Sequence, residues 1–129
     1  MALDLSSLLD RVYFRYPSFL IDGVTDHEPG VRLAAVKNVT VAEDFFQGHF
    51  PRQPVMPAVL MIEALTQVAS ALILERDGMS PNARVSLRGV NGAKFRRQVV
   101  PGDQVRLEVK LGRCRSRLAK AEAMAFIGE

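Results

Sequence analysis

The chain has 129 residues, which is enough for one domain with a hydrophobic core and too few for two such domains. Hydrophobic residues make up 48% of it and charged residues 24%, the balance of an ordinary soluble globular protein. One cysteine excludes an intrachain disulfide, and together with two histidines it leaves too few ligands for a zinc site. No apolar run reaches the roughly 18 residues of a membrane span, and the first residues do not resemble a secretory signal, so we expect a cytoplasmic protein.

The net charge of +3 is distributed unevenly. Residues 84–120 contain 11 Lys or Arg residues and 2 acidic residues, whereas residues 1–83 contain 6 and 10. Such a basic segment indicates either an anionic partner or a solvated strand face, and charge alone does not separate the two. Phe95 is its one aromatic residue, so there is little support for stacking on nucleic-acid bases.

The first third of the chain predicts a short helix and a β-hairpin. Residues 4–12 have the apolar spacing of a helix. Residues 18–26 and 31–40 are predicted strands, and the turn His27-Glu28-Pro29-Gly30 joins them, since proline and glycine mark a reversal between β-rich runs. Because His27 lies in this polar turn, we expect its side chain to be exposed.

The middle of the chain predicts a loop and then a long helix. Residues 41–57 contain three prolines, which favour a stiff loop without regular structure. Apolar residues then recur at helical spacing from residue 58 to about residue 76, directly after Pro57, which suits a helix start. Nearly every face of this helix is apolar, so we expect it to be buried. Glu63 and Gln67 interrupt the apolar surface four residues apart and therefore share a face.

The last third predicts four more strands, at residues 83–91, 94–100, 104–113 and 117–127, with Pro101-Gly102-Asp103 as a hairpin turn. Strands, one buried helix and more strands indicate the α+β class, with an antiparallel sheet around a central helix. We expect the whole chain to form this single domain.

His49 and Glu63 are the candidate acid–base residues. His49 lies in Phe45-Phe46-Gln47-Gly48-His49-Phe50-Pro51, where aromatic neighbours favour the neutral imidazole that a general base requires. Glu63 projects from an apolar helix, which favours the protonated form that a general acid requires. Either residue alone is also consistent with a hydrogen-bonded structural side chain. Together they define an acid–base site.

The start of the helix supplies a third element, because its first backbone amides have no intrahelical acceptors and the helix dipole is positive there. Such an end can hold a carbonyl oxygen on which negative charge develops. A base, an acid and an oxyanion donor fit proton abstraction beside a carbonyl with loss of a β-hydroxyl.

Nucleophilic and phosphate chemistry have little support. The sequence contains neither a G-x-S-x-G elbow nor a glycine-rich phosphate loop. Cys114 lies between Arg113 and Arg115, but no histidine is near it in sequence, so we expect an unreactive strand cysteine.

The motifs around these residues resemble the 3-hydroxyacyl-[acyl-carrier-protein] dehydratases of fatty-acid synthesis. The central similarity is Phe45 to Pro51, then Pro54-Val55-Met56-Pro57, then Ile62-Glu63-Ala64-Leu65 and Gln67. Supporting similarities are Phe19-Leu20-Ile21-Asp22, Val36-Lys37-Asn38-Val39-Thr40, Phe95-Arg96-Arg97 and Val100-Pro101-Gly102-Asp103. The resemblance covers almost the whole chain, and it implies a hot-dog fold, in which a curled antiparallel sheet wraps the long helix.

The resemblance also implies a role for each matching residue. His49 would abstract the C2 proton of a (3R)-3-hydroxyacyl thioester, and Glu63 of the partner subunit would assist departure of the C3 hydroxyl to give the trans-2-enoyl product. The amide of Ala58 would polarise the thioester carbonyl, and Gln67 would orient Glu63. Phe46 and Phe50 complete the expected substrate-binding set. No metal and no redox cofactor is implied.

The implied partners are a second copy of the chain and an acyl carrier protein. The family forms dimers with active sites at the interface, and these usually assemble further into hexamers. Three prolines in residues 51–57 favour an extended chain that carries His49 away from its own helix. The carrier protein is acidic, which gives the basic segment a natural partner, with Arg96 and Arg97 as expected contacts; neither nucleic acid nor a membrane is implied.

Two departures from the family pattern concern Ala58 and the C-terminus. The family usually has glycine where this chain has Ala58, and we expect the added methyl group to change the rate or the substrate fit. The chain ends at Ile127-Gly128-Glu129, where the family continues into one further strand, so we expect that strand to be lacking.

Three alternatives remain open. A hot-dog thioesterase would hydrolyse the same substrates, but it needs a carboxylate placed to activate water rather than this His–Glu pair. A dehydratase that also isomerises the double bond usually has aspartate at the position of Glu63, which favours plain dehydration. A non-catalytic carrier-binding subunit is consistent with Ala58 and the short C-terminus.

Overall fold

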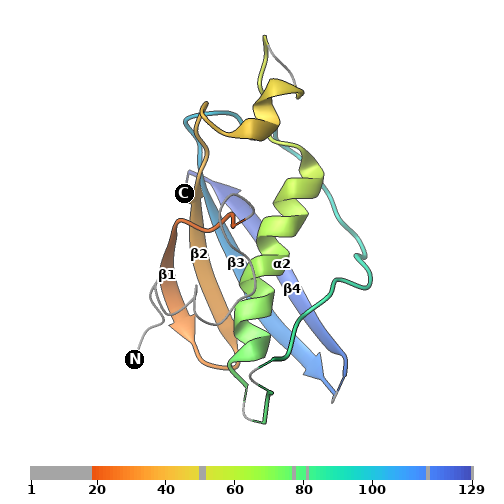
Figure 1. The fold of residues 1–129 in the computed structure, drawn as a ribbon. Coiled ribbons are helices and arrows are strands. Elements are labelled where there is room, and N and C mark those ends of the chain that lie inside the picture. Colours follow the sequence, from red (N-terminus) through yellow and green to blue (C-terminus); the bar gives the residue numbers. More distant parts are fainter. Residues whose placement is uncertain (1–18, 50–51, 77, 81, 116, 129) are drawn as a thin grey trace.

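The computed structural model describes residues 19–128 except 50–51, 77, 81 and 116, and of residues 44 and 47 it describes only the backbone. The predicted helix at residues 4–12 lies outside the described residues. The elements are β1 (Gly23–Glu28), β2 (Arg32–Asn38), the 3-10 helix η1 (Asp44–Gln47), α2 (Ala58–Leu74), β3 (Gln104–Cys114) and β4 (Ala119–Ile127) (Figure 1). No helix in this part of the chain is long and apolar enough to cross a membrane.

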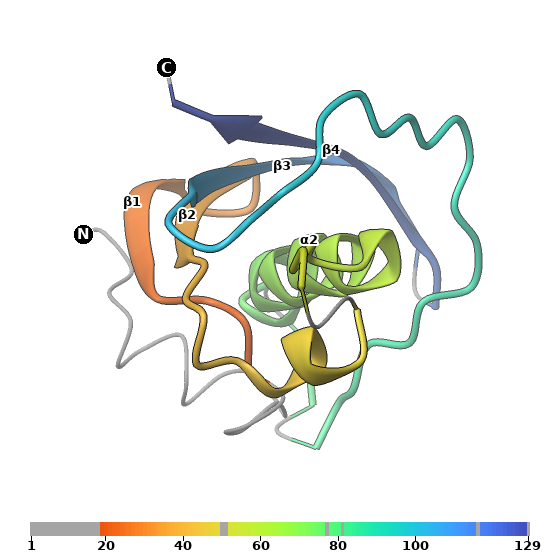
Figure 2. The same ribbon diagram turned by 90° about the horizontal axis from the view of Figure 1, so that it is seen from above.

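The four strands form one antiparallel sheet in the order β1-β2-β3-β4. Seen from above in Figure 2, the sheet curls around one side of α2. The predicted α+β class and hot-dog architecture, with a sheet wrapped around one long helix, are therefore confirmed. The helix ends at Leu74, two residues before the predicted boundary.

The core lies between α2 and the concave face of the sheet. Alternate residues of β2 and β3 point inward, as strand geometry requires, and small and branched residues of α2 pack against them. The residues at this contact that are at most 2% exposed are Leu33, Ala35, Val105, Leu107 and Val109 from the sheet and Ala64, Val68, Ala71 and Leu72 from the helix. This packing fixes the rotation of α2 and therefore the direction of its polar side chains.

The predicted β1–β2 hairpin forms, with Gly30 at φ 74° in the turn, but its first strand runs from Gly23 to Glu28 rather than over residues 18–26. His27 therefore lies in the strand and not in the turn, and its expected exposure is wrong. Its side chain is 4% exposed and its Nε2 lies 2.8 Å from a carboxylate oxygen of Glu75. The amide of Gly30 also donates to Glu75, at 2.9 Å. His27 pairs with Leu33, an inward-facing residue of β2, so strand alternation turns His27 toward the end of α2.

The two strands predicted at residues 83–91 and 94–100 are not formed. Described residues between 83 and 103 have no regular secondary structure, and every side chain from 86 to 98 is exposed. Their alternating pattern suits a strand, but a strand also needs a neighbouring backbone. This segment, residues 83–103, which we call the arm, instead passes outside β4 and borders a groove with α2 and β4 (Figures 1 and 2).

The expected burial of α2 on all sides is also wrong for the face toward the arm. Val59 is 68% exposed, and Ile62, Leu65 and Ile73 are only partly buried. The sheet covers one side of the helix, and a groove separates Ile62, Leu65 and Ile73 from the arm.

Candidate active site

The segment before His49 is anchored by aromatic packing. The Phe45 and Phe46 rings in η1 have centroids 4.5 Å apart and planes at 59°. Phe46 is 5% exposed and belongs to the core cluster. Phe46 therefore anchors η1, and the structure gives it no open face toward a ligand; Phe50 lies outside the described residues.

His49 is held by Val55, a partner that the sequence analysis did not identify. Nδ1 of His49 lies 2.8 Å from the carbonyl oxygen of Val55, and the amide of Val55 donates to the carbonyl of His49 at 3.0 Å. A carbonyl oxygen only accepts, so Nδ1 carries the proton. In the neutral ring, Nε2 is then the atom that can take up a proton, which is the state of a general base.

These reciprocal bonds contradict the expectation that the proline-rich loop is extended. They bring residues 49 and 55 side by side, which an extended chain would not do. The far end of the loop is fixed in turn, because the amide of Met56 donates to the carbonyl of Val99 at 2.7 Å.

Ala58 is the first residue of α2 and is exposed. The helical hydrogen bonds begin after it, because the carbonyl of Pro57 accepts from the amides of Leu60 at 3.0 Å and Met61 at 3.3 Å. The amide of Ala58 thus precedes the helical ladder at the positive end of the helix dipole. This is the position expected for the oxyanion donor.

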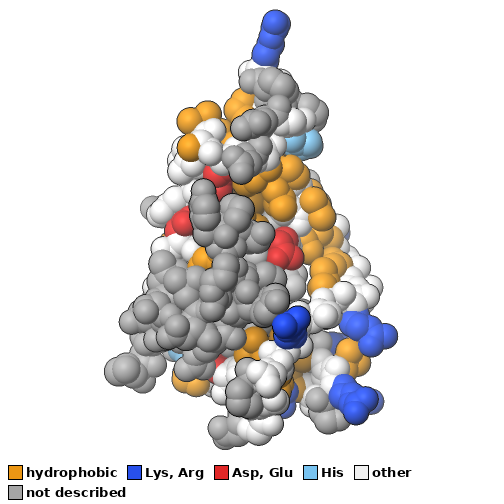
Figure 3. Space-filling view, viewed as in Figure 1, with side chains coloured by type: hydrophobic (Ala, Val, Ile, Leu, Met, Phe, Trp, Pro, Cys, Tyr) orange, Lys and Arg blue, Asp and Glu red, His pale blue; other side chains and the backbone are white. Residues whose placement is uncertain are grey.

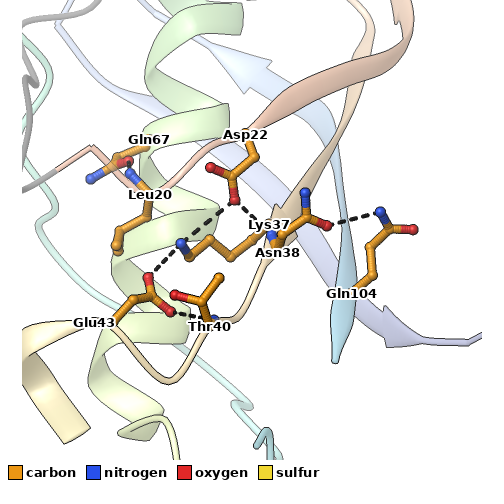
Figure 4. A network of polar contacts seen from close by, with 8 residues as sticks. All are labelled: Leu20, Asp22, Lys37, Asn38, Thr40, Glu43, Gln67 and Gln104. Atoms are coloured by element: carbon orange, nitrogen blue, oxygen red, sulfur yellow. Dashed lines mark hydrogen bonds and ion pairs between the residues drawn. The ribbon is translucent and has the colours of Figure 1, made fainter. Parts of the chain in front are cut away.

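Glu63 and Gln67 are brought together as predicted. Nε2 of Gln67 donates to Oε2 of Glu63 at 2.9 Å. Gln67 is fully buried, and its Oε1 accepts the backbone N–H of Leu20 at 2.8 Å (Figure 4). The sequence did not predict this hydrogen bond from the Leu20 backbone to Gln67, although Leu20 lies in the supporting motif Phe19-Leu20-Ile21-Asp22.

A second polar network, shown in Figure 4, connects β2 to the loop that carries His49. Lys37 is 6% exposed, and its Nζ lies 2.5 Å from Glu43 and 3.5 Å from Asp22. Glu43 also accepts the amide of Thr40 at 3.1 Å, and Asp22 accepts that of Asn38 at 2.6 Å. A lysine at an inward-facing strand position is the sequence signal that could have revealed this network.

A groove of about 1540 Å³ runs along α2, between the helix, the arm and β4. Its lining includes Ala58, Ile62, Leu65 and, from the arm, Arg96 and Arg97, which are exposed. In Figure 3 hydrophobic side chains follow the face where α2 lies, and basic side chains gather toward its lower end. His49 and Glu63 are not among the lining residues. Within a single chain, Glu63 is therefore hydrogen-bonded to Gln67, and Ala58 lines the same groove as Arg96 and Arg97. The two acid–base residues, His49 and Glu63, do not line this groove.

Comparison with known proteins identifies the family. Residues 15–129 match the FabA-like domain. The proteins named 3-hydroxyacyl-[acyl-carrier-protein] dehydratase FabZ from Desulforamulus reducens and Polaromonas sp. are 44% and 42% identical to this chain, over 98% of it and 89% of each relative. The protein of the same name from Myxococcus xanthus is 41% identical, over 97% of this chain and 82% of that relative.

Among solved structures, the dehydratase heterocomplex ApeI:P from Xenorhabdus doucetiae matches with a TM-score of 0.54. It covers 66% of this chain and 69% of the other, at 24% identity, and so bears on the fold alone. The family match extends over all described residues, including both polar networks and the His49 loop. The chain therefore belongs to the family of FabA-like domains.

Proposed function

We propose that this chain removes water from (3R)-3-hydroxyacyl-[acyl-carrier-protein] and releases trans-2-enoyl-[acyl-carrier-protein] in fatty-acid biosynthesis. Relatives that carry the name of this activity are 41–44% identical over nearly the whole chain. The observation that carries the proposal is the bond from His49 Nδ1 to Val55, because it leaves Nε2 as the atom to accept a proton.

In the proposed reaction, Nε2 of His49 removes the proton from C2. Negative charge develops on the thioester oxygen, which the amide of Ala58 stabilises at the N-terminus of α2. Glu63 gives its proton to the C3 hydroxyl, the C3–O bond breaks, and water leaves as the C2–C3 double bond forms. The reaction involves no net oxidation or reduction, so it calls for no redox cofactor.

The active site is proposed to be shared between two copies of the chain, with His49 from one and Glu63 from the other. This arrangement is what the family resemblance implies, since the family's active sites lie at the dimer interface. Dimers would assemble further into a hexamer, as a trimer of dimers. The acyl chain would lie in the groove, along Ile62, Leu65 and Ile73 of α2.

The proposed carrier contact is the exposed pair Arg96 and Arg97. Both line the groove, which would place an acidic carrier next to the opening through which its acyl chain enters. Opposite charge at such a contact speeds association more than it adds affinity.

The test is turnover of a 3-hydroxybutyryl thioester by the purified chain. Appearance of enoyl absorbance without free thiol is expected. Release of thiol would indicate a thioesterase instead. Binding of acyl carrier protein without elimination, and without hydration of a crotonyl thioester in the reverse direction, would indicate a non-catalytic carrier-binding subunit.

A further inference from the structure

We propose that Ala69 of α2 and Ala123 of β4 are specificity-determining residues that let the groove hold long acyl chains, and that the preferred substrates are unbranched 3-hydroxyacyl groups of about twelve to sixteen carbons. The inference rests on the proposed function, in which the acyl chain lies in the groove with its thioester at Ala58. It adds the length of the acyl chain and the residues that limit it.

The first step concerns the wall of the groove that α2 forms. Its apolar residues recur at intervals of three or four positions, so they form one row along the helix. They are Ile62, Leu65, Ala69 and Ile73, all of which line the groove and are only partly buried. Thr66 lies in the same wall, but its hydroxyl already donates to the carbonyl of Ile62 at 2.8 Å. The wall is therefore apolar along the helix and suits a hydrocarbon chain.

The second step concerns the opposite wall, which β4 forms. Ala123 pairs with Val109 of β3, and Ala125 pairs with Leu107. Residues paired across two strands lie on one face of the sheet, and Val109 and Leu107 are buried in the core, so both alanines are on the face toward α2. The branched side chains of β3 fill the space up to the helix, whereas the alanines of β4 are exposed and line the groove. The small side chains of β4 therefore leave the space that an acyl chain would occupy.

The third step concerns depth along the groove. A helix rises about 1.5 Å per residue, which places Ala69 about 16 Å and Ile73 about 22 Å along the axis from Ala58. An extended hydrocarbon chain, whose C–C bonds are about 1.5 Å long, advances about 1.3 Å per carbon. A chain of about twelve carbons thus reaches Ala69, and one of about sixteen approaches Ile73. Ala123 is the central residue of β4, so a larger side chain at either alanine would narrow the groove before its far end.

Beyond Ile73 the lining of the groove becomes basic. Arg76 follows the end of α2 and Arg115 follows the end of β3, and both line the groove. These two ends lie close together, because the β1–β2 turn is hydrogen-bonded to both of them. Figure 3 accordingly shows basic side chains gathered at the lower end of the hydrophobic face. The methyl end of an acyl chain gains little among solvated cations, so the favoured chain length ends near Ile73.

Two substitutions test the proposal through the dependence of kcat/KM on chain length. With 3-hydroxyacyl pantetheine thioesters of about four to sixteen carbons, kcat/KM of the wild type should rise with length, because each methylene buried in the groove strengthens binding. Ala69→Leu and Ala123→Leu fill part of the groove. In each variant, the ratio of kcat/KM for the longest substrate to that for the shortest should fall about tenfold or more, the equivalent of about two methylenes left unburied.

Ala42→Leu is the matched control, since Ala42 is exposed and is not among the residues that line the groove. It should leave the ratio at its wild-type value. A wild type that shows no preference for longer chains, or a ratio that stays unchanged in both groove variants, would overturn the proposal. Leucine is a good helix former, so Ala69→Leu should fold; if it does not, the ratio in Ala123→Leu decides.

Binding measured without turnover separates this inference from the proposed function. Saturated acyl pantetheine thioesters lack the 3-hydroxyl group and cannot lose water, so calorimetric titration with them reports on the groove alone. Their affinity should rise with chain length in the wild type and level off at shorter chains in the two groove variants. This pattern in a protein that does not dehydrate a 3-hydroxyacyl thioester would refute the proposed function and keep the length assignment. Dehydration together with affinities that do not depend on chain length would refute the length assignment alone.

Discussion

The carbonyl oxygen of Val55 lies 2.8 Å from Nδ1 of His49, and the Val55 amide returns a hydrogen bond to the His49 carbonyl at 3.0 Å. These two bonds fix the tautomer of the ring and close the loop on which it stands. Because both Val55 groups belong to the backbone, the side chain at position 55 is not what orients the histidine.

The first prediction is that neutral His49 carries its proton on Nδ1 and that the residue acts as the base. His49→Ala should lower kcat by about 10²–10⁴-fold, the usual contribution of a general base. ¹⁵N NMR of the wild-type ring should show a protonated Nδ1 in the neutral form. His27→Gln serves as the control, since His27 contacts Glu75 at the other end of α2 and should leave turnover nearly unchanged. A neutral ring protonated on Nε2 would contradict the assignment.

The second prediction concerns the methyl group at the start of α2. Ala58→Gly should raise turnover or broaden the range of accepted thioesters, because Ala58 is exposed at the groove and its methyl crowds the expected path of the thioester. Glycine should also lower the free energy of unfolding, by at most about 1 kcal/mol. Steady-state kinetics with short and long acyl thioesters, together with thermal melts, measure both effects. A clear fall in kcat/KM would show that the backbone at the start of α2 has adapted to alanine at position 58.

The third prediction is that Lys37 maintains the loop that carries His49. Lys37→Met keeps the length of the side chain but leaves Asp22 and Glu43 without their cation. Both carboxylates retain some exposure, so we expect the free energy of unfolding to fall by about 1–3 kcal/mol. Urea unfolding measures the change, and the exposed Lys110→Met on β3 is the matched control, expected to be within about 0.5 kcal/mol of wild type. Equal stability of the two variants would argue against a structural role for the network.

The sequence predicted the elements whose signals are local. Apolar spacing located α2 to within two residues of its end, and alternation located β3 and β4. The motif spacing paired Glu63 with Gln67, which lie one helical turn apart. These features depend only on periodicity, which a single chain displays without knowledge of its neighbours.

The features that were missed depend on distant partners. The arm has the alternation of a strand, yet it forms no ladder with the sheet in the described chain. His27 looks exposed in a polar turn, but its partner Glu75 is 48 positions away. Leu20 contacts Gln67 through its backbone, which no side-chain pattern reveals. Contacts of this kind follow from the tertiary fold rather than from local sequence.

The fourth prediction is that the arm binds the acidic carrier protein. Replacing both Arg96 and Arg97 with glutamate should lower kcat/KM for carrier-bound substrate more than for a small thioester. The difference between the two substrates should shrink as salt is added. A double reversal at Lys110 and Arg113 changes the net charge equally, at exposed positions outside the groove lining, and should have a smaller effect. Equal losses on both substrates at every ionic strength would reject the contact.

The fifth prediction is that each active site takes His49 from one subunit and Glu63 from the other. His49→Ala and Glu63→Gln should each be nearly inactive alone. When the two variants are co-expressed, a mixed dimer has one site with both substitutions and one site with neither. Random pairing makes about half the dimers mixed, so about one quarter of wild-type activity should return. Differently tagged chains purified in tandem would establish that mixed dimers form. If both groups came from a single chain, every site would carry a substitution, and activity near zero in those tandem-purified dimers would exclude a shared site.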